Sequence, residues 1–344
     1  VVNNRNTLDL PFKRYQIQPV WRADRPQKGR YREFWQCDVD VVGTDSLLAE
    51  SEYVQMYDQA LGRLGLRDFE IRVNHRGLLL ALAQKLGAED KYTDICVAID
   101  KLDKIGREKV EEELKERGIA QDKLSELAPL FELQGDAEVQ VASLSGWLGD
   151  TAAGPAAISD LQTLLNYLIP TPLQHGRLII DPTLARGLNY YTGCIFEVKA
   201  SNPEFGSIGG GGRYDDLTGM FGWKGLSGVG ISFGADRIYD VMEAEGLFED
   251  VPKTKTRVLM INFGGKAEAK SVEVAARLRL VGIPTEVYPD NDKKIGKQFG
   301  YADSKGIPYV LIIGEKEVEA SDYQLKDMAA GKQEALSLDD IVER

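Results

Sequence analysis

Two stretches near the start of the chain alternate between apolar and polar residues, with a basic segment between them. Residues 15–22 and 34–42 both have a period of two, which is the period of a β-strand. The apolar positions, predicted to face a core, are Tyr15, Ile17, Pro19, Trp21, Trp35, Cys37, Val39 and Val41. The intervening positions are polar apart from Val20, Phe34 and Val42. The pattern therefore predicts a two-stranded hairpin with one core face and one polar face.

The next part of the chain changes from strand to helix periodicity and back. Residues 44–66 have helical spacing, with Asp45 or Ser46 as the expected N-cap and Gly65 near the end. A strand pattern follows at 68–76, and residues 77–168 contain several polar helical segments. Their charge runs are typical of solvated helix faces. Strand patterns resume at Arg177, and a glycine-rich strand then leads directly into a helix within residues 226–247.

The C-terminal part has a different organisation. The run VPKTKT at 251–256 favours a linker. Beyond it strand and helix alternate, which predicts a small α/β domain with a mostly parallel sheet. We therefore expect a sheet domain in two parts, residues 1–76 and 173–250, a helical insertion at 77–172, and an α/β domain at 256–344.

Composition limits the class of protein. At 344 residues the chain exceeds one ordinary domain of roughly 150 residues. No apolar run approaches the roughly 20 residues that a membrane span requires. Cys37, Cys96 and Cys194 form no CxxC pair, so neither a disulfide framework nor a zinc ribbon is expected, and a reducing cytoplasm fits best.

Positive charge is concentrated in the predicted hairpin, although the formal net charge of the chain is -12. Seven lysines and arginines lie between residues 13 and 32, against one acid, Asp24. Arg22 ends the first strand, and Arg25, Lys28 and Arg30 lie in the loop. Arginine can bind a phosphoryl group with two parallel hydrogen bonds, so this loop is a candidate phosphate site. The alternative is a basic surface loop without a ligand.

Two further motifs contain candidate site residues. Arg186 precedes the pair Tyr190 and Tyr191. On a regular strand adjacent side chains point to opposite faces, so at most one of these tyrosines is expected to face a given pocket. Four consecutive glycines at 209–212 predict that a ligand or another strand approaches the backbone closely. Tyr214 follows two residues later.

The glycine-rich strand at 228–234 ends in a helix whose first turn carries Arg237, where the helix N-terminus already favours anions. The third glycine is one position late for a dinucleotide fingerprint, which argues against a nicotinamide-dependent dehydrogenase. His75 and His175 are isolated and are expected to be structural or exposed. They provide neither a metal-ligand cluster nor a Ser-His-Asp centre.

Four segments, in this order, closely resemble the histidyl-tRNA synthetases, a family of class II aminoacyl-tRNA synthetases. They are WRADRPQKGRYREFWQ, LARGLNYYTGCIFEV, GGGGRYDDL and GISFGADR. The resemblance implies an α+β class II catalytic core, an antiparallel sheet flanked by helices, with a helical insertion and a C-terminal α/β anticodon-binding domain. It also implies a homodimer that activates L-histidine with ATP and transfers it to tRNA(His).

The resemblance also assigns residues. Arg22, Arg30 and Arg237 would bind the phosphates of ATP and Phe34 its adenine, while Mg2+ would accompany ATP without a protein metal site. Histidine would be bound by a larger set: Gln36, Asp40, Arg186, Tyr190, Tyr191 and Tyr214. The catalytic residues would be Arg186 and Arg22, because a guanidinium can stabilise charge developing on the α-phosphoryl oxygens.

The chain departs from the family pattern in several places. Asp40, Asn189 and Asp236 stand where relatives commonly carry Glu, Asp and Glu. Motif one and a Thr-x-Glu segment would precede Val1, so we expect a longer natural enzyme and, for this chain alone, poor dimerisation and weak histidine activation. The alternative is a non-catalytic, histidine-binding regulatory paralogue. Such a protein should lack the arginines and the C-terminal domain, and this chain has both.

Overall fold

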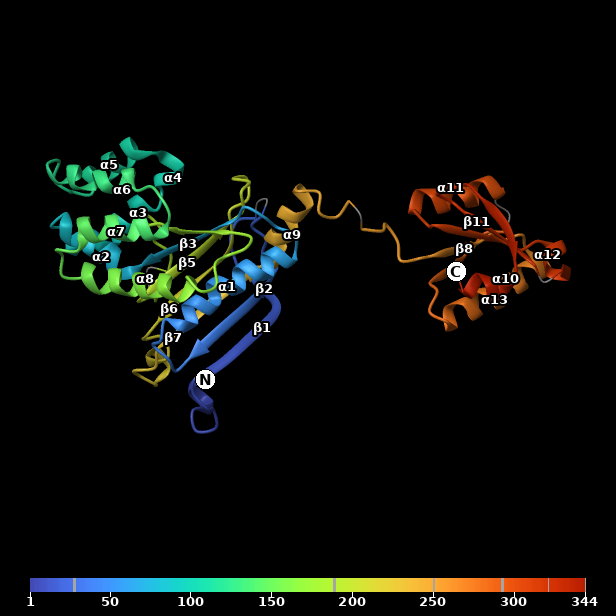
Figure 1. Cartoon of the computed structure of the whole chain (residues 1–344), viewed down its shortest axis with the longest axis horizontal. Helices are drawn as coiled ribbons and strands as arrows, with labels where there is room; N and C mark the ends of the chain where they lie inside the picture. The colour runs from blue at the N-terminus through green and yellow to red at the C-terminus, as the bar shows by residue number, and fades with distance from the viewer. Residues whose placement is uncertain (27–28, 188–189, 250, 292–293, 321, 344) are drawn as a thin grey trace. The chain divides into compact units, whose positions relative to one another are not determined.

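The structure is a computed structural model that describes residues 1–26, 29–187, 190–249, 251–291, 294–320 and 322–343. The chain divides into two compact units, Val1–Leu247 and Phe248–Arg344. The first is built on a seven-stranded sheet and the second on a five-stranded sheet (Figure 1).

The sheet of the first unit brings together strands from distant parts of the sequence. Its strands are β1 (Phe12–Trp21), β2 (Glu33–Val42), β3 (Glu70–His75), β4 (Arg177–Ile180), β5 (Cys194–Lys199), β6 (Ser207–Tyr214) and β7 (Gly228–Gly234). Their order is β1-β2-β7-β6-β5-β3-β4, and every neighbouring pair is antiparallel except β3 and β4. The expected antiparallel sheet is confirmed. As a result the basic hairpin lies beside the two glycine-rich strands.

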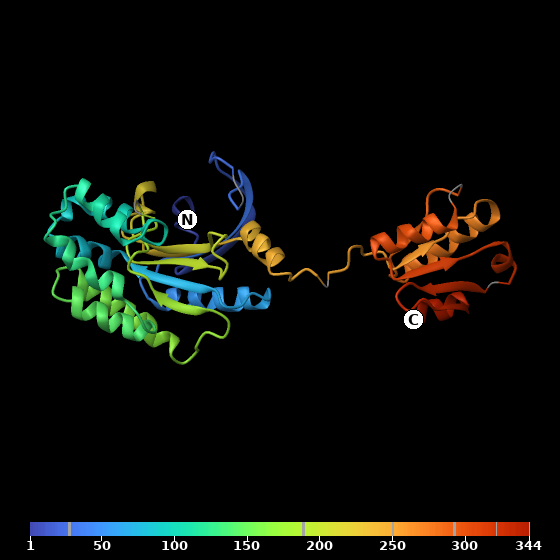
Figure 2. The ribbon, with the colours of Figure 1, turned by 90° about the horizontal axis from the view of Figure 1, so that it is seen from above.

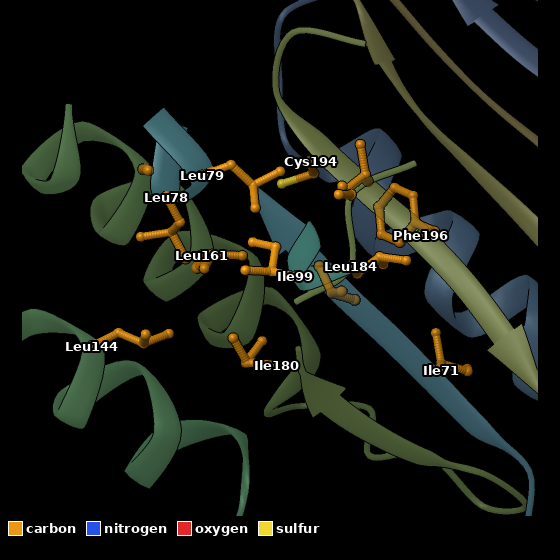
Figure 3. Close-up of a cluster of buried hydrophobic side chains, with 14 of the residues drawn as sticks. Ile71, Leu78, Leu79, Ile99, Leu144, Leu161, Ile180, Leu184, Cys194 and Phe196 are labelled. Atoms are coloured by element: carbon orange, nitrogen blue, oxygen red, sulfur yellow. The ribbon is translucent and has the colours of Figure 1, made fainter. Parts of the chain in front are cut away.

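Helices pack on this sheet and share one hydrophobic core with it. They are α1 (Leu48–Arg63), α2 (Arg76–Lys85), α3 (Tyr92–Ile99), α4 (Leu102–Ile105), α5 (Arg107–Glu116), α6 (Ala128–Glu132), α7 (Ala137–Leu148), α8 (Gly154–Leu168) and α9 (Ala235–Ala244). Figure 3 shows Ile99, Leu144 and Leu161 from the helices in the same buried cluster as Ile71 and Phe196 from the strands. The helical segments at 76–168 are therefore joined to the sheet by continuous apolar packing.

Helix α1 holds the sheet from the core side, and Figure 2 shows it lying along the strands. It begins at Leu48 with Leu47 as its N-cap and without a side-chain cap, so the prediction of Asp45 or Ser46 as the N-cap is wrong. The N–H of Leu48 donates to the Ser46 hydroxyl at 3.3 Å. The buried hydroxyls of Tyr53 and Tyr57 donate to backbone carbonyls of β7 at 3.2 and 3.1 Å. These bonds fix the strand that runs between the hairpin and the glycine run.

The predicted hairpin forms, and its register runs from Phe12 opposite Val42 to Trp21 opposite Glu33. However, the predicted core face is largely exposed, at 77% for Tyr15, 69% for Trp21 and 50% for Trp35. Strand β1 lies at the edge of the sheet, and these exposures show that the outer half of this face is open among the described residues. The prediction of a core there is wrong for these side chains, while Val41 is buried as expected.

The second unit alternates strand and helix. Its elements are β8 (Val258–Met260), α10 (Gly265–Leu280), β9 (Thr285–Val287), α11 (Ile295–Lys305), β10 (Tyr309–Ile312), α12 (Glu315–Ala320), β11 (Tyr323–Asp327), β12 (Gln333–Leu336) and α13 (Leu338–Glu343). Strands β9, β8 and β10 are parallel, as predicted, but β11 and β12 extend the sheet in antiparallel fashion. Successive residues of β8 belong to different apolar clusters, so both faces of this sheet are covered. Within the described ranges, no helix has both the length and the apolar character of a membrane span.

Candidate active site

The backbone of β6 and β7 forms the floor of a cavity of about 330 Å³. Gly210 lines this cavity, and a Cβ atom there would collide with the guanidinium of Arg186. Gly212 lies two residues further along the strand, where a Cβ atom would collide with the ring of Tyr191 and the carbonyl of Cys194. The predicted close approach to the glycine run is therefore confirmed, but at these two glycines it is made by the side chains of two predicted site residues and not by a ligand or another strand.

Four arginines gather around this cavity. Arg22, Arg186 and Arg237 line it, and Arg30 lies close enough to influence the same charges. Arg237 is fixed by donating to the carbonyl of Ser207 at 2.6 Å and to that of Gly29. Burial lowers the pKa of Arg237, and the positive charges of Arg22, Arg186 and Arg30 lower it further. Such a concentration of partly buried guanidinium groups favours a ligand with several negative charges.

Asp24 and Phe34 contact the arginines of the hairpin. The Oδ2 atom of Asp24 lies 3.4 Å from Nε of Arg22 and 3.1 Å from Nη2 of Arg30. The guanidinium of Arg22 also lies 4.2 Å from the centre of the Phe34 ring. A phosphate bound by Arg22 and Arg30 would compete with this carboxylate, and a base stacked on Phe34 would displace Arg22. Lys28 of the same loop lies outside the described residues.

Both tyrosines of the Tyr190–Tyr191 pair line the cavity, so the prediction that at most one would do so is wrong. They lie in a turn instead of a strand, and both of their N–H groups donate to the carbonyl of Gly187. Their ring centres are 4.3 Å apart. Gln36 lines the same cavity and donates to the hydroxyl of Ser232 at 3.0 Å. Asn189 lies outside the described residues.

Asp40 and Tyr214 lie in a neighbouring hollow of about 340 Å³ that is also lined by Arg14. The hydroxyl of Tyr214 donates to Asp40 at 2.9 Å, and Nη1 of Arg14 lies 3.3 Å from the same carboxylate. Burial raises the pKa of Asp40, against the opposing effects of Tyr214 and Arg14. The predicted histidine-binding residues are thus divided between two hollows. Arg14 was missed at the sequence level, although it lies on the polar face of β1 directly opposite Asp40.

Arg213, in the same glycine-rich strand, faces the other way. Its guanidinium forms two contacts with the carboxylate of Glu50, and its side chain is 7% exposed while that of Glu50 is fully buried. It also donates to the hydroxyl of Ser227 at 2.6 Å. This arginine is therefore structural. Arg213 and Tyr214 are adjacent on one strand, so their side chains point to opposite faces. This adjacency was the sign in the sequence that the two residues have different roles.

The described residues offer few groups that could hold a metal ion. They contain no cluster of three His, Cys, Asp or Glu side chains with suitable geometry. In the cavity, Asp236 already accepts the N–H of Trp35 at 2.6 Å. His75, as predicted, is structural, because its Nδ1 accepts the Gly77 N–H at the start of α2. A divalent cation here would need most of its ligands from a bound phosphate compound.

Comparison with known proteins identifies the family. The family model for histidyl-tRNA synthetase matches residues 5–238, and that for an anticodon binding domain matches residues 257–344. The chain is 50% identical over 342 residues to a histidine–tRNA ligase of Christiangramia forsetii, covering 99% of this chain and 75% of that protein. It is 48% identical to that of Cytophaga hutchinsonii, covering 100% of this chain and 76% of the relative.

A solved structure agrees with this result. The crystal structure of histidyl-tRNA synthetase from Nostoc sp. PCC 7120 matches with a TM-score of 0.82 and 31% identity, covering 99% of this chain and 79% of that one. The resemblance expected from four short segments thus extends over the whole sequence and the fold. The antiparallel sheet is that of a class II synthetase core, and the chain belongs to the histidyl-tRNA synthetase family.

Proposed function

We propose that this chain carries out the reaction for which its relatives are named, the ligation of histidine to tRNA. In the first step L-histidine and ATP give histidyl-adenylate and diphosphate. In the second step histidine passes to the 3′ end of tRNA(His) and AMP is released. The observation that carries the proposal is the group of four arginines, Arg22, Arg30, Arg186 and Arg237, beside a glycine floor.

ATP would bind along the hairpin side of the cavity. Arg22 would hold the α-phosphate, and Arg30 and Arg237 the outer phosphates, after Asp24 has been displaced from the first two. Adenine would then stack on the Phe34 ring in place of the Arg22 guanidinium. The nucleotide would enter as its Mg2+ complex, with the ion held mainly by phosphate oxygens. The fixed position of Arg237 between two backbone carbonyls supports its role as an anchor.

Histidine would bind across the two hollows. Gln36, Tyr190 and Tyr191 surround the cavity in which its carboxylate must meet the α-phosphate. Asp40 and Tyr214 provide an acceptor and a hydroxyl for the imidazole ring. A site that hydrogen-bonds both ring nitrogens discriminates strongly against amino acids that lack them, because its own buried polar groups would then be unpaired.

In the chemical step a carboxylate oxygen of histidine forms a bond to the α-phosphorus, and the bond from that phosphorus to the diphosphate oxygen breaks. Negative charge shifts among the phosphoryl oxygens and onto the diphosphate. Arg186, whose guanidinium lies over Gly210 at the cavity floor, is placed to stabilise that charge together with Arg22. No general base is needed, because the nucleophile is already ionised at neutral pH.

The remaining assignments follow from the same family. Residues 1–76 and 173–250 would form the catalytic domain, with 77–172 as a helical insertion in it. Residues 256–344 would bind the anticodon of tRNA(His). We further propose that the native enzyme is a homodimer located in the cytoplasm.

The test is diphosphate exchange into ATP by the native enzyme expressed from its complete gene, with each of the 20 amino acids in turn. We expect exchange with histidine alone, followed by transfer of histidine to tRNA(His) but not to other tRNAs. Exchange with a different amino acid would overturn the proposal. Histidine binding by calorimetry without any exchange would instead favour the non-catalytic regulatory paralogue.

A further inference from the structure

A network of charged side chains connects Arg186 to the helical region. Nε of Arg186 lies 3.2 Å from Oε1 of Glu197, and Nζ of Lys199 lies 3.7 Å from Oε2 of the same carboxylate. Lys199 reaches Asp103 of helix α4 at 2.8 Å, and Arg72 reaches that carboxylate at 3.0 Å. The charges alternate in sign along this path, so each group stabilises its neighbours.

The sheet places this network of charged side chains on the same face as the cavity. In the strand register Arg72 lies opposite Glu197, and Glu197 lies opposite Gly210. These three residues therefore form one row across β3, β5 and β6. Because Gly210 has no side chain, the Arg186 guanidinium can lie over it while its Nε contacts Glu197 in the same row.

The backbone that leads to Arg186 is held by the same part of the helical region. The carboxylate of Asp100, at the end of α3, accepts the N–H of Ala185 at 3.3 Å. The side-chain amide of Asn74 on β3 donates to the carbonyl of Leu184 at 2.9 Å. Segment 100–103 thus makes two kinds of contact. Asp100 contacts the backbone just before Arg186, and Asp103 contacts the charged side chains that surround the Arg186 guanidinium.

The network is ionic and partly shielded from solvent. The side chain of Glu197 is 14% exposed, and that of Arg72 is 20% exposed. Burial alone would lower the pKa of Arg72, but Asp181, Glu70 and Asp103 together raise it. For Asp103 the directions are opposite: burial alone would raise the pKa of its carboxyl, but Lys199 and Arg72 lower it. Removing one partner would leave its neighbours incompletely paired.

We propose that Glu197 is a positioning residue for Arg186, and that segment 100–103 supports it through Lys199. The rate of histidyl-adenylate formation then depends on how the helical region packs against β3 and β5. This inference rests on the proposed function, because Arg186 must first be the group that stabilises the α-phosphoryl charge. A change in the packing of the helical region would then alter the rate of the chemical step through Glu197 and Arg186.

The first test is Glu197→Gln in the native enzyme, which keeps the side-chain shape and removes its charge. We expect kcat for histidine-dependent exchange to fall about 10- to 100-fold, as misplaced catalytic groups typically cost, with KM for ATP and histidine nearly unchanged. Asp103→Asn, which is one link further away, should lower kcat less. The matched control is Asp150→Asn, which removes an ion pair with Lys85 in the same helical region and should leave kcat unchanged.

A second test separates positioning from general structural support. In an Arg186→Ala background, Glu197→Gln and Asp103→Asn should cause no further loss of kcat, because they act through the missing guanidinium. An equal loss in both backgrounds, or an unchanged kcat for Glu197→Gln in the wild-type background, would overturn the inference. Should Glu197→Gln not fold, Lys199→Met is expected to show the same dependence on Arg186. No exchange by the wild-type enzyme would overturn the proposed function itself.

Discussion

The two faces of strand β6 use the same stretch of sequence for different purposes. On the cavity face Gly210 and Gly212 provide bare backbone beneath Arg186 and Tyr191. On the opposite face Arg213 forms a buried ion pair with Glu50 of α1. An arginine that is buried together with its partner is structural, whereas partly exposed arginines gathered beside an open floor attract a ligand even where each contacts a carboxylate. The difference lies in the neighbours and not in the residue type.

The largest effect is expected from a substitution on the buried face of β6, and it should appear in the free energy of unfolding. Arg213→Ala leaves the Glu50 carboxylate without its partner in the core and should lower the free energy of unfolding by about 3–5 kcal/mol. Urea denaturation measures this loss. Replacing both residues by leucine removes the buried charges together and should restore much of the stability. A loss below about 1 kcal/mol for Arg213→Ala would contradict a structural role, given the usual cost of breaking a buried pair.

Breaking the cavity face should affect rate instead of stability. Arg186→Ala is expected to slow single-turnover adenylate formation about 10²–10³-fold, the usual cost of losing a donor to developing charge. ATP binding should be largely retained, because Arg22, Arg30 and Arg237 remain. The free energy of unfolding is the internal control and should fall by no more than about 1 kcal/mol, because Arg186 is partly exposed and Glu197 keeps Lys199 as a partner. An unaltered single-turnover rate would remove Arg186 from the mechanism.

A smaller effect is expected from filling the floor itself. Gly210→Ala places a Cβ atom where the Arg186 guanidinium lies, so the arginine must shift. Since small displacements of positioned groups reduce catalysis, we expect kcat for exchange to fall by about tenfold. The matched control is Gly146→Ala in helix α7, where a Cβ meets no neighbouring atom and kcat should not change. Equal kcat values for the two variants would mean that Arg186 does not act from this position.

The smallest effect concerns the anion already beside the arginines. Asp24→Asn removes the carboxylate that contacts Arg22 and Arg30. Because such partly exposed pairs contribute about 0.2–1 kcal/mol, KM for ATP should fall by roughly 1.4- to 5-fold. The effect should weaken as salt is added, because salt screens exposed charges. A higher KM for ATP in Asp24→Asn would show that Asp24 assists nucleotide binding instead of competing with it.

Much of the candidate site could be predicted from local sequence. The hairpin was visible in the alternation of residues 15–22 and 34–42, and Gly210 and Gly212 in the glycine run. The prediction that at most one of Tyr190 and Tyr191 faces the cavity was wrong, because it assumed strand geometry where the chain makes a turn. The N-cap of α1 was predicted at Asp45 or Ser46, but the helix begins slightly later, with Leu47 as its N-cap.

Burial was harder to predict than local structure. The apolar face of the hairpin was expected to be a core, yet Tyr15, Ile17 and Trp21 are exposed because β1 is an edge strand. Alternation shows that a strand has two chemically different faces. Which of them is covered depends on elements elsewhere in the chain.

By itself the sequence determined the family, the polar face of the hairpin and the identity of the arginines, because these depend on residue types at short spacings. Only the tertiary structure decided which residues meet. It paired β2 with β7 and β5 with β6, turned Arg213 away from Arg186, joined Arg14 to Asp40, and placed Asp103 in contact with the charges around Arg186. The physical reason is that strand pairing and helix packing act between residues far apart in the chain, where local periodicity carries no information.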